Sequence, residues 1–166
     1  MPVETSELKR AAAKEGKYLT FALGHEEYGL EILGVREIIG LMEITAVPQV
    51  PDYVKGVINL RGKVIPVIDL RLKFKMEKHV YDNETCIIVL NVANTLMGIV
   101  VDKVCEVLDI AGDHIEPPPC FGAKIHTDFL TGMGKVGDKV KILLDINSVL
   151  IEDISIGKQI TSGAAQ

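Results

Sequence analysis

Residues Val47–Leu70 read VPQVPDYVKGVINLRGKVIPVIDL and carry the pattern of a β-hairpin. Two stretches rich in β-branched residues, Val57–Leu60 and Lys63–Asp69, are separated only by Arg61 and Gly62. A glycine in a two-residue connection is typical of a tight hairpin turn, because it tolerates a positive φ angle. We therefore expect two antiparallel strands, with the Arg61 side chain displayed at the bend between them.

The returning strand of this hairpin is apolar at consecutive positions, Val64–Ile68, and so lacks a solvated face. Both of its faces must be covered. Pro66 cannot donate a hydrogen bond to a neighbouring strand, so we expect it at a sheet edge or at a bulge. Such a strand favours a small, sharply bent sheet over a wide flat one.

The second half of the chain repeats the first. Residues Asp52–Phe74 align without a gap with Asp128–Leu150, and the earlier strands align at a second constant offset. The identical pairs in the first alignment are Asp52/Asp128, Gly56/Gly132, Lys63/Lys139, Val64/Val140 and Asp69/Asp145. The second alignment pairs Phe21/Leu90, Gly29/Gly98, Ile32/Val101, Val35/Val104, Glu37/Glu106 and Ile38/Val107.

Short strands with glycine at their corners favour small barrels whose edges close on each other. We expect an all-β protein with short helices, in which residues 17–154 form one domain of two intertwined β-barrel lobes. The lobes are expected to cover about 17–84 and 85–154, with polar tails at 1–16 and 155–166. Between Leu33 and Leu41 the pattern fits a short helical turn or a bent strand equally well.

Composition excludes several classes of function. The net charge of −5 and a pI of about 5.4 argue against binding to a nucleic-acid backbone, and the absence of Trp leaves few stacking platforms. No stretch is long and apolar enough for a membrane helix, and residues 1–16 lack a secretory signal. Cys86, Cys105 and Cys120 have no CxxC spacing, which indicates reduced, structural thiols in the cytoplasm.

One motif matches the glycine pattern of a dinucleotide-binding loop. Residues Gly132–Gly137 have the sequence GxGxxG. The residues that follow, Asp138–Asp145, alternate between polar and apolar like a strand, whereas a nucleotide-binding loop is followed directly by a helix. The four histidines are far apart in sequence and lack metal-site spacing, and no nucleophile motif occurs. We expect no enzyme activity, no metal and no cofactor.

Two charged residues lie on otherwise apolar segments. Glu37 and Arg61 are less expected there as mere solubilising charges, which makes them candidates for partner contacts. They can equally be a strand-end surface residue and a turn residue. The residues alone leave both interpretations open.

The Asn59-Leu60-Arg61-Gly62 turn and the following Val64–Leu70 strand resemble the signature of the CheW family of chemotaxis coupling proteins. The similarity extends upstream through Phe21–Leu30 and Val35–Ile38, and downstream to about Leu150. It therefore covers nearly the whole chain, and its motifs are jointly specific.

The resemblance implies two SH3-like, five-stranded β lobes with a hydrophobic groove where they meet. It further implies a non-enzymatic adaptor that joins the cytoplasmic tip of a chemoreceptor to the regulatory domain of the histidine kinase CheA, in arrays beneath the inner membrane. The expected receptor- or kinase-binding residues, taken from the matching motifs, are Val35, Glu37, Ile38, Gly56, Asn59, Arg61 and Gly62. The rival hypothesis is a small-ligand or nucleotide-binding regulator that uses the groove and the Gly132–Gly137 loop.

Overall fold

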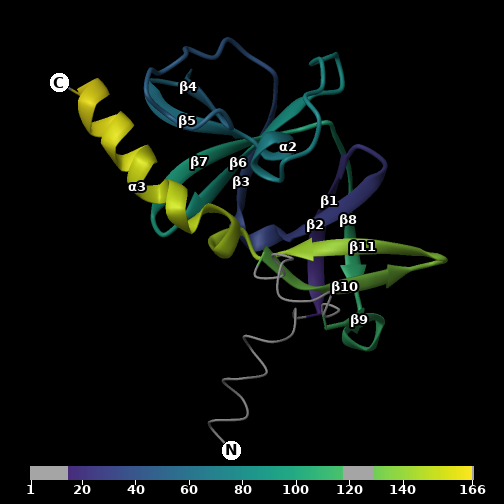
Figure 1. Cartoon of the computed structure of the whole chain (residues 1–166). Helices are drawn as coiled ribbons and strands as arrows, with labels where there is room; N and C mark the ends of the chain where they lie inside the picture. The colour runs from purple at the N-terminus through teal and green to yellow at the C-terminus, as the bar shows by residue number, and fades with distance from the viewer. Residues whose placement is uncertain (1–14, 118–128, 166) are drawn as a thin grey trace, which may run out of the picture. The chain divides into compact units, whose positions relative to one another are not determined.

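A computed structural model describes residues 15–117 and 129–165, which are mainly β-strand (Figure 1). The strands form two sheets, one of six strands and one of five. The six-stranded sheet has the order β8 (Lys103–Ile110), β1 (Gly16–Leu23), β2 (Glu26–Glu31), β11 (Lys139–Leu144), β10 (Leu130–Val136) and β9 (Ile115–Glu116). The five-stranded sheet has the order β3 (Val35–Gly40), β6 (Cys86–Val92), β7 (Thr95–Val101), β5 (Lys63–Asp69) and β4 (Val54–Leu60).

Helical structure is limited. Two 3₁₀ turns, η1 (Ile32–Gly34) and η2 (Gly112–His114), and the one-turn helix α2 (Leu70–Lys73) follow strands, and the helix α3 covers Ile146–Ala165. The stretch from Leu33 to Leu41, for which the sequence left two possibilities, contains both of them: η1 leads directly into β3.

The described residues divide into two compact units. Unit 1 contains the residues up to Ile32 and those from Cys105 to Val149, and so holds the six-stranded sheet. Unit 2 contains Leu33–Val104 and the part of α3 that begins at Leu150, and holds the five-stranded sheet. This division differs from the expected one at residue 84, because each unit draws strands from both halves of the chain.

The exchange concerns the first hairpin of each half. The β1–β2 hairpin joins β8, β10 and β11 of the second half, and the β6–β7 hairpin joins β3, β4 and β5 of the first. Each hairpin contacts the other half on both sides, and one contact in each unit is a parallel pair, β2 with β11 and β5 with β7. The alternation of a strand specifies which face is buried but not which strand lies beside it, so the sequence pattern could not reveal the exchange.

The two units repeat each other in detail, as the sequence alignment predicted. Val67 pairs with Gly98 in unit 2, and Leu143 pairs with Gly29 in unit 1. A register shift occurs at the same place in both, between Val54 and Gly56 on β4 and between Leu130 and Gly132 on β10. The strand after Gly137 is β11, so no helix follows the GxGxxG sequence.

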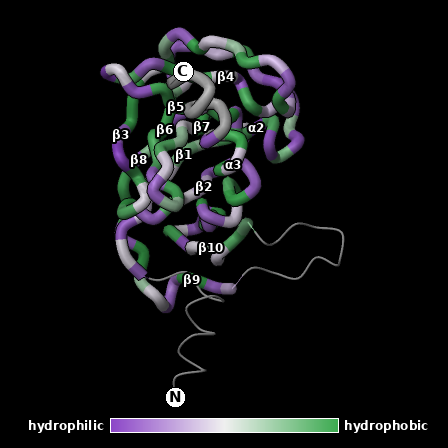
Figure 2. The backbone as a smooth tube through the Cα atoms, turned by 90° about the vertical axis from the view of Figure 1, so that its left-hand side faces the viewer, coloured by the Kyte–Doolittle hydropathy of each residue, from purple (hydrophilic) through white to green (hydrophobic). Residues whose placement is uncertain are grey.

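The core of unit 2 is formed by buried aliphatic side chains of β4, β5, β6 and β7, and residues of β6 and β7 are coloured mainly as hydrophobic in Figure 2. The buried members are Ile58, Ile65, Val67, Ile87, Val89 and Val100. Unit 1 has a corresponding cluster of Tyr18, Ile110 and Leu143.

Pro66 is at neither of the places expected for it, a sheet edge or a bulge. Strand β5 lies between β7 and β4, and the register shift of the β4–β5 pair falls between Val54 and Gly56, next to Val57, the partner of Pro66. Pro66 does precede Val67, the first residue of β5 that pairs with β7. The carbonyl oxygen of Pro66 faces the β7 side, and the carbonyl and amide of a strand residue point the same way. The missing N–H of Pro66 therefore falls just before the paired part of the β5–β7 ladder.

The expected C-terminal tail from residue 155 is instead the continuation of α3 as far as Ala165. The Asp145 carboxylate caps this helix by accepting hydrogen bonds from the Asn147 and Ser148 backbone N–H groups. Further along, Leu150 and Ile154 are buried and lie on one face of the helix, one turn apart.

A buried polar cluster in unit 2 also holds α3. The Asp153 carboxylate, 1% exposed, accepts a hydrogen bond from the Tyr53 hydroxyl at 2.7 Å and pairs with Lys73 Nζ at 2.7 Å. The Lys73 ammonium also lies 4.5 Å from the centre of the Tyr53 ring. Burial and the hydrogen bond to Asp153 raise the pKa of Tyr53, so the phenol stays a donor.

Backbone geometry explains Gly56. Its φ angle is 141°, and a Cβ atom there would collide with the Thr45 carbonyl oxygen and lie 2.7 Å from the carbonyl carbon. At this point β4 is bridged by the Thr45 segment, with the Thr45 N–H donating to the Val57 oxygen at 2.8 Å and the Val57 N–H donating to the Thr45 oxygen at 2.9 Å. A side chain at Gly56 would push this segment away.

Replacing Gly56 with alanine should therefore destabilise the protein by about 2–4 kcal/mol, through strain at a positive φ angle and the lost bridge. Gly40→Ala is the matched control, because a Cβ atom at Gly40 meets no atom within 4 Å. Urea unfolding of both variants measures the difference. Equal midpoints for the two variants would contradict this explanation of Gly56.

Candidate functional site

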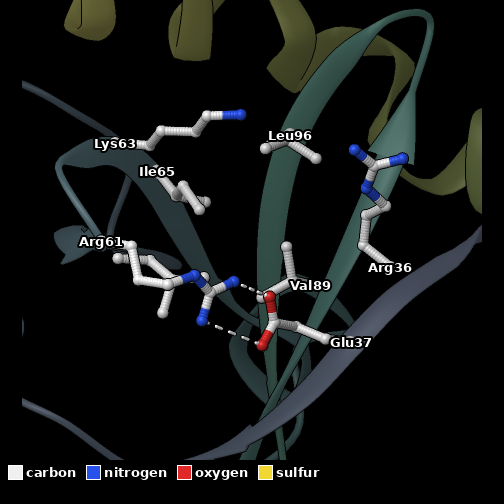
Figure 3. Close-up of a pocket in the computed structure, with 8 residues that line it drawn as sticks. Arg36, Glu37, Arg61, Lys63, Ile65, Val89 and Leu96 are labelled. Atoms are coloured by element: carbon white, nitrogen blue, oxygen red, sulfur yellow. Dashed lines mark hydrogen bonds and ion pairs between the residues drawn. The ribbon is translucent and has the colours of Figure 1, made fainter.

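The candidate site is built around an ion pair between Glu37 on β3 and Arg61 in the β4–β5 turn. Strands β3 and β4 are at opposite ends of the five-stranded sheet. Their side chains can meet only because the sheet curls round on itself. Figure 3 shows the Arg61 guanidinium and the Glu37 carboxylate pointing toward each other. The pair therefore lies where the two ends of the sheet approach.

The β4–β5 turn presents Arg61 in a fixed direction. Leu60 pairs with Lys63, and the two residues between them have positive φ angles, 51° at Arg61 and 87° at Gly62. The Asn59 side chain stabilises the turn, because its Oδ1 atom accepts a hydrogen bond from the Gly62 N–H at 2.9 Å. Asn59 and Gly62 thus position Arg61.

The ion pair is bidentate and open to solvent. Arg61 Nη1 donates to Glu37 Oε2 at 3.4 Å, and Nη2 donates to Glu37 Oε1. The Arg61 side chain is 70% exposed and that of Glu37 is 34% exposed. The hydrogen bonds that Arg61 donates to Glu37, with the attraction of the Glu37 charge, raise the pKa of Arg61. Such a pair contributes little to stability, but it holds both charges in one orientation.

A hollow of about 250 Å³ lies beside the pair, with an apolar floor and a charged rim (Figure 3). Its floor includes the buried side chains of Ile65 and Val89. The full lining is Arg36, Glu37, Leu60, Arg61, Lys63, Ile65, Val89 and Leu96. Three of the lining residues are cations and one is an anion, so the rim favours an acidic group on whatever binds.

The structure brings together some of the expected site residues and separates others. Glu37 and Arg61 line the hollow, whereas Ile38, 42% exposed, alternates with Glu37 and faces away from it. Val35 is half-buried on the same strand. Gly56 is buried and is explained by its contact with Thr45.

Six of the lining residues were missed in the sequence, and they are Arg36, Leu60, Lys63, Ile65, Val89 and Leu96. Arg36 and Lys63 flank the two chosen charges and carry the same signal, a charge on an apolar segment. Leu96 could not be found in this way. It comes from β7 in the other half of the chain, and only the parallel pairing of β5 with β7 places it here.

Unit 1 has a hollow of about 300 Å³ near the β1–β2 turn, with a different lining. Its residues are His25, Glu26, Glu27, Lys139, Val140 and Lys141. The Lys141 ammonium pairs with the Glu27 carboxylate at 2.6 Å, and the Lys141 side chain is only 7% exposed. The hydrogen bond from Lys141, with the attraction of its charge, lowers the pKa of Glu27.

Other classes of site find no support in the part of the chain that is described. Residues 15–117 and 129–165 contain no group of three or more side chains suited to a metal ion. Cys86 and Cys105 form no disulfide there, and Cys120 and His126 lie outside the described residues. No described helix is long and apolar enough to cross a membrane.

Comparison with known proteins identifies the family. The model of the CheW-like domain matches residues 17–153. The chain belongs to the CheW family. Among curated relatives, the CheW chemotaxis protein of Klebsiella aerogenes is 46% identical over 134 residues, which are 81% of this chain and 81% of that protein. The CheW of Thermotoga maritima is 31% identical over 150 residues, 87% of this chain and 93% of that protein.

A solved CheW structure agrees with the fold. The scaffolding protein CheW of Thermoanaerobacter tengcongensis matches with a TM-score of 0.76 and 38% identity, over 82% of this chain and 92% of that one. The sheets described above are thus those of the CheW fold, with SH3-like lobes. CheW-family proteins are chemotaxis scaffolds and not enzymes.

The lowered pKa of Glu27 predicts an acid-sensitive contribution to stability. A carboxyl whose pKa is lower in the folded state stabilises the fold above its ordinary value of 4.5, and this contribution is lost as the pH falls through the folded pKa. Glu27→Gln should therefore lower the melting temperature at pH 7 more than at pH 3.

The control is Glu116→Gln, which removes an exposed ion pair with Lys135 at 2.8 Å. Melting temperatures of both variants between pH 3 and pH 7 provide the measurement. A Glu27→Gln curve that runs parallel to that of the wild type would show that the Glu27–Lys141 pair has no such role.

Proposed function

We propose that this CheW-family chain couples the cytoplasmic tip of a chemoreceptor to the regulatory domain of the histidine kinase CheA, and that it acts at receptor arrays beneath the inner membrane. The observation that carries the proposal is the fixed Glu37–Arg61 pair on the rim of an apolar hollow, within a chain of the CheW family. Docking of this kind requires burial of apolar surface together with charges that fix the orientation of the partner.

The two parts of the site have separate roles in this proposal. The apolar floor receives an apolar side chain from a partner helix or loop, and burial of that side chain supplies affinity. The rim supplies specificity. Arg61 keeps its other guanidinium donors available for a partner carboxylate, while Glu37 holds the guanidinium in place, and Arg36 and Lys63 add positive charge.

The other expected residues have different roles in the proposal. Ile38 is an exposed apolar side chain on the outer face of β3 and suits a second contact, as does the neighbouring Val35. Asn59 and Gly62 act through the turn that presents Arg61. Gly56 acts through the backbone that it allows to pack.

Reversal of either rim charge should weaken binding. Glu37→Lys and Arg61→Glu each place like charges opposite a complementary partner, and we expect the affinity for a receptor-tip fragment or the kinase regulatory domain to fall roughly tenfold or more. The melting temperature should change little, because both side chains are exposed to solvent. Isothermal titration and thermal melting measure the two quantities.

A charge exchange separates partner contact from a purely structural role. The double variant Glu37→Arg/Arg61→Glu keeps an ion pair within the chain but inverts the charges that a partner meets. The matched control is Lys17→Asp/Asp109→Lys, at an exposed pair in unit 1 that joins at 2.9 Å. If the Glu37→Arg/Arg61→Glu protein binds both partners as the control does, the rim charges do not contact them.

A further inference from the structure

The two units differ at one equivalent pair of positions. In unit 1, the β2 residue Glu27 and the β11 residue Lys141 form an ion pair at 2.6 Å, in which the Lys141 side chain is buried and that of Glu27 is 28% exposed. In unit 2, the corresponding positions on β7 and β5 are Leu96 and Ile65, which line the unit 2 hollow and pack in its core. The same structural position is thus charged in one unit and apolar in the other.

Strand register establishes that these positions are equivalent. Leu143 pairs with Gly29 across the parallel junction of unit 1, and Val67 pairs with Gly98 across that of unit 2. Lys141 and Ile65 lie two residues before Leu143 and Val67, and Glu27 and Leu96 lie two residues before the glycines. Each pair therefore spans the junction between a hairpin and the strand from the other half of the chain.

A second position of the two hairpins also differs in polarity. Thr20 on β1 is fully buried, and its hydroxyl donates to the Glu106 carbonyl at 2.8 Å and accepts from the Glu106 N–H at 3.1 Å. The equivalent residue of β6 is Val89, which pairs with Glu37 and belongs to the apolar core of unit 2. The β1–β2 hairpin thus carries a polar residue where the β6–β7 hairpin carries an apolar one, although the residue that this position meets is a glutamate in both units.

The contrast between Glu27–Lys141 and Leu96–Ile65 matters because the chain is a repeat. The β1–β2 and β6–β7 hairpins have the same design, and so do the two sets of strands that receive them, β8, β10 and β11 in unit 1 and β3, β4 and β5 in unit 2. Either hairpin could therefore join either set. If the β6–β7 hairpin joined β11, Leu96 would replace Glu27 beside Lys141. The Lys141 ammonium would then be buried without a carboxylate, which disfavours that pairing by roughly a hundredfold or more.

We propose that the Glu27–Lys141 pair, opposed to Leu96–Ile65, selects which hairpin each unit accepts and so directs the exchange of hairpins between the two halves of the chain. An ion pair in this position does not need to add stability, since a buried ion pair often stabilises a fold no more than apolar residues of similar volume do. Its effect is to make the wrong pairing unfavourable, within one chain or between two copies.

The test is an apolar variant of the full chain, Glu27→Leu/Lys141→Ile, in which both junctions carry the same residue types. We expect it to unfold at a denaturant concentration close to that of the wild type, but to refold into more than one species. Size-exclusion chromatography and amide NMR spectra after refolding from urea detect additional oligomers and duplicate resonances. The wild type should refold to one species under the same conditions.

The matched control is the inverted pair, Glu27→Lys/Lys141→Glu, which exchanges the charges but keeps the contrast with Leu96–Ile65. It should refold to one species, as the wild type does. The proposal is overturned if the apolar variant refolds to a single species with the wild-type spectrum, or if the inverted and apolar variants refold to the same mixture. Should the inverted variant fail to fold, the apolar variant alone decides the question.

Discussion

The parallel junction between a hairpin of one half and the returning strand of the other is the contact on which this fold depends. It occurs once in each unit, between β2 and β11 and between β5 and β7. A glycine stands at each junction, and a Cβ atom at Gly29 or Gly98 would come within 2.9 Å of a Leu143 or an Ile87 side-chain carbon. Each glycine therefore leaves room for an aliphatic side chain packed over it, Leu143 in unit 1 and Ile87 in unit 2.

The candidate site depends on this junction indirectly. The β6–β7 hairpin connects β3 on one side to β5 and β4 on the other, so the five-stranded sheet exists only once the hairpin is in place. Curvature of that sheet then brings Glu37 to Arg61 and sets Leu96 beside Ile65. The candidate site, whose charged residues come from the first half of the chain, is thus completed by strands from the second.

The two units use the same backbone for different interiors. Unit 2 has Leu96 and Ile65 where unit 1 has the Glu27–Lys141 ion pair, and it has Arg61 where unit 1 has Gly137. Two copies of one design have therefore acquired different surfaces and different interiors. A scaffold protein gains from such divergence, because two unlike surfaces can recognise two unlike partners.

The sequence by itself determined much of this protein, because local rules act within short segments. The Arg61-Gly62 turn, the strands around it, the internal repeat and the CheW resemblance all follow from residues close together in the chain. Glu37 and Arg61 were also recognisable as unusual charges. By contrast, the exchange of hairpins, the inner position of Pro66, the α3 helix beyond residue 154 and the place of Leu96 in the hollow were decided by tertiary structure. Strand patterns specify buried faces but not neighbours, and these features depend on which strands and helices pack together.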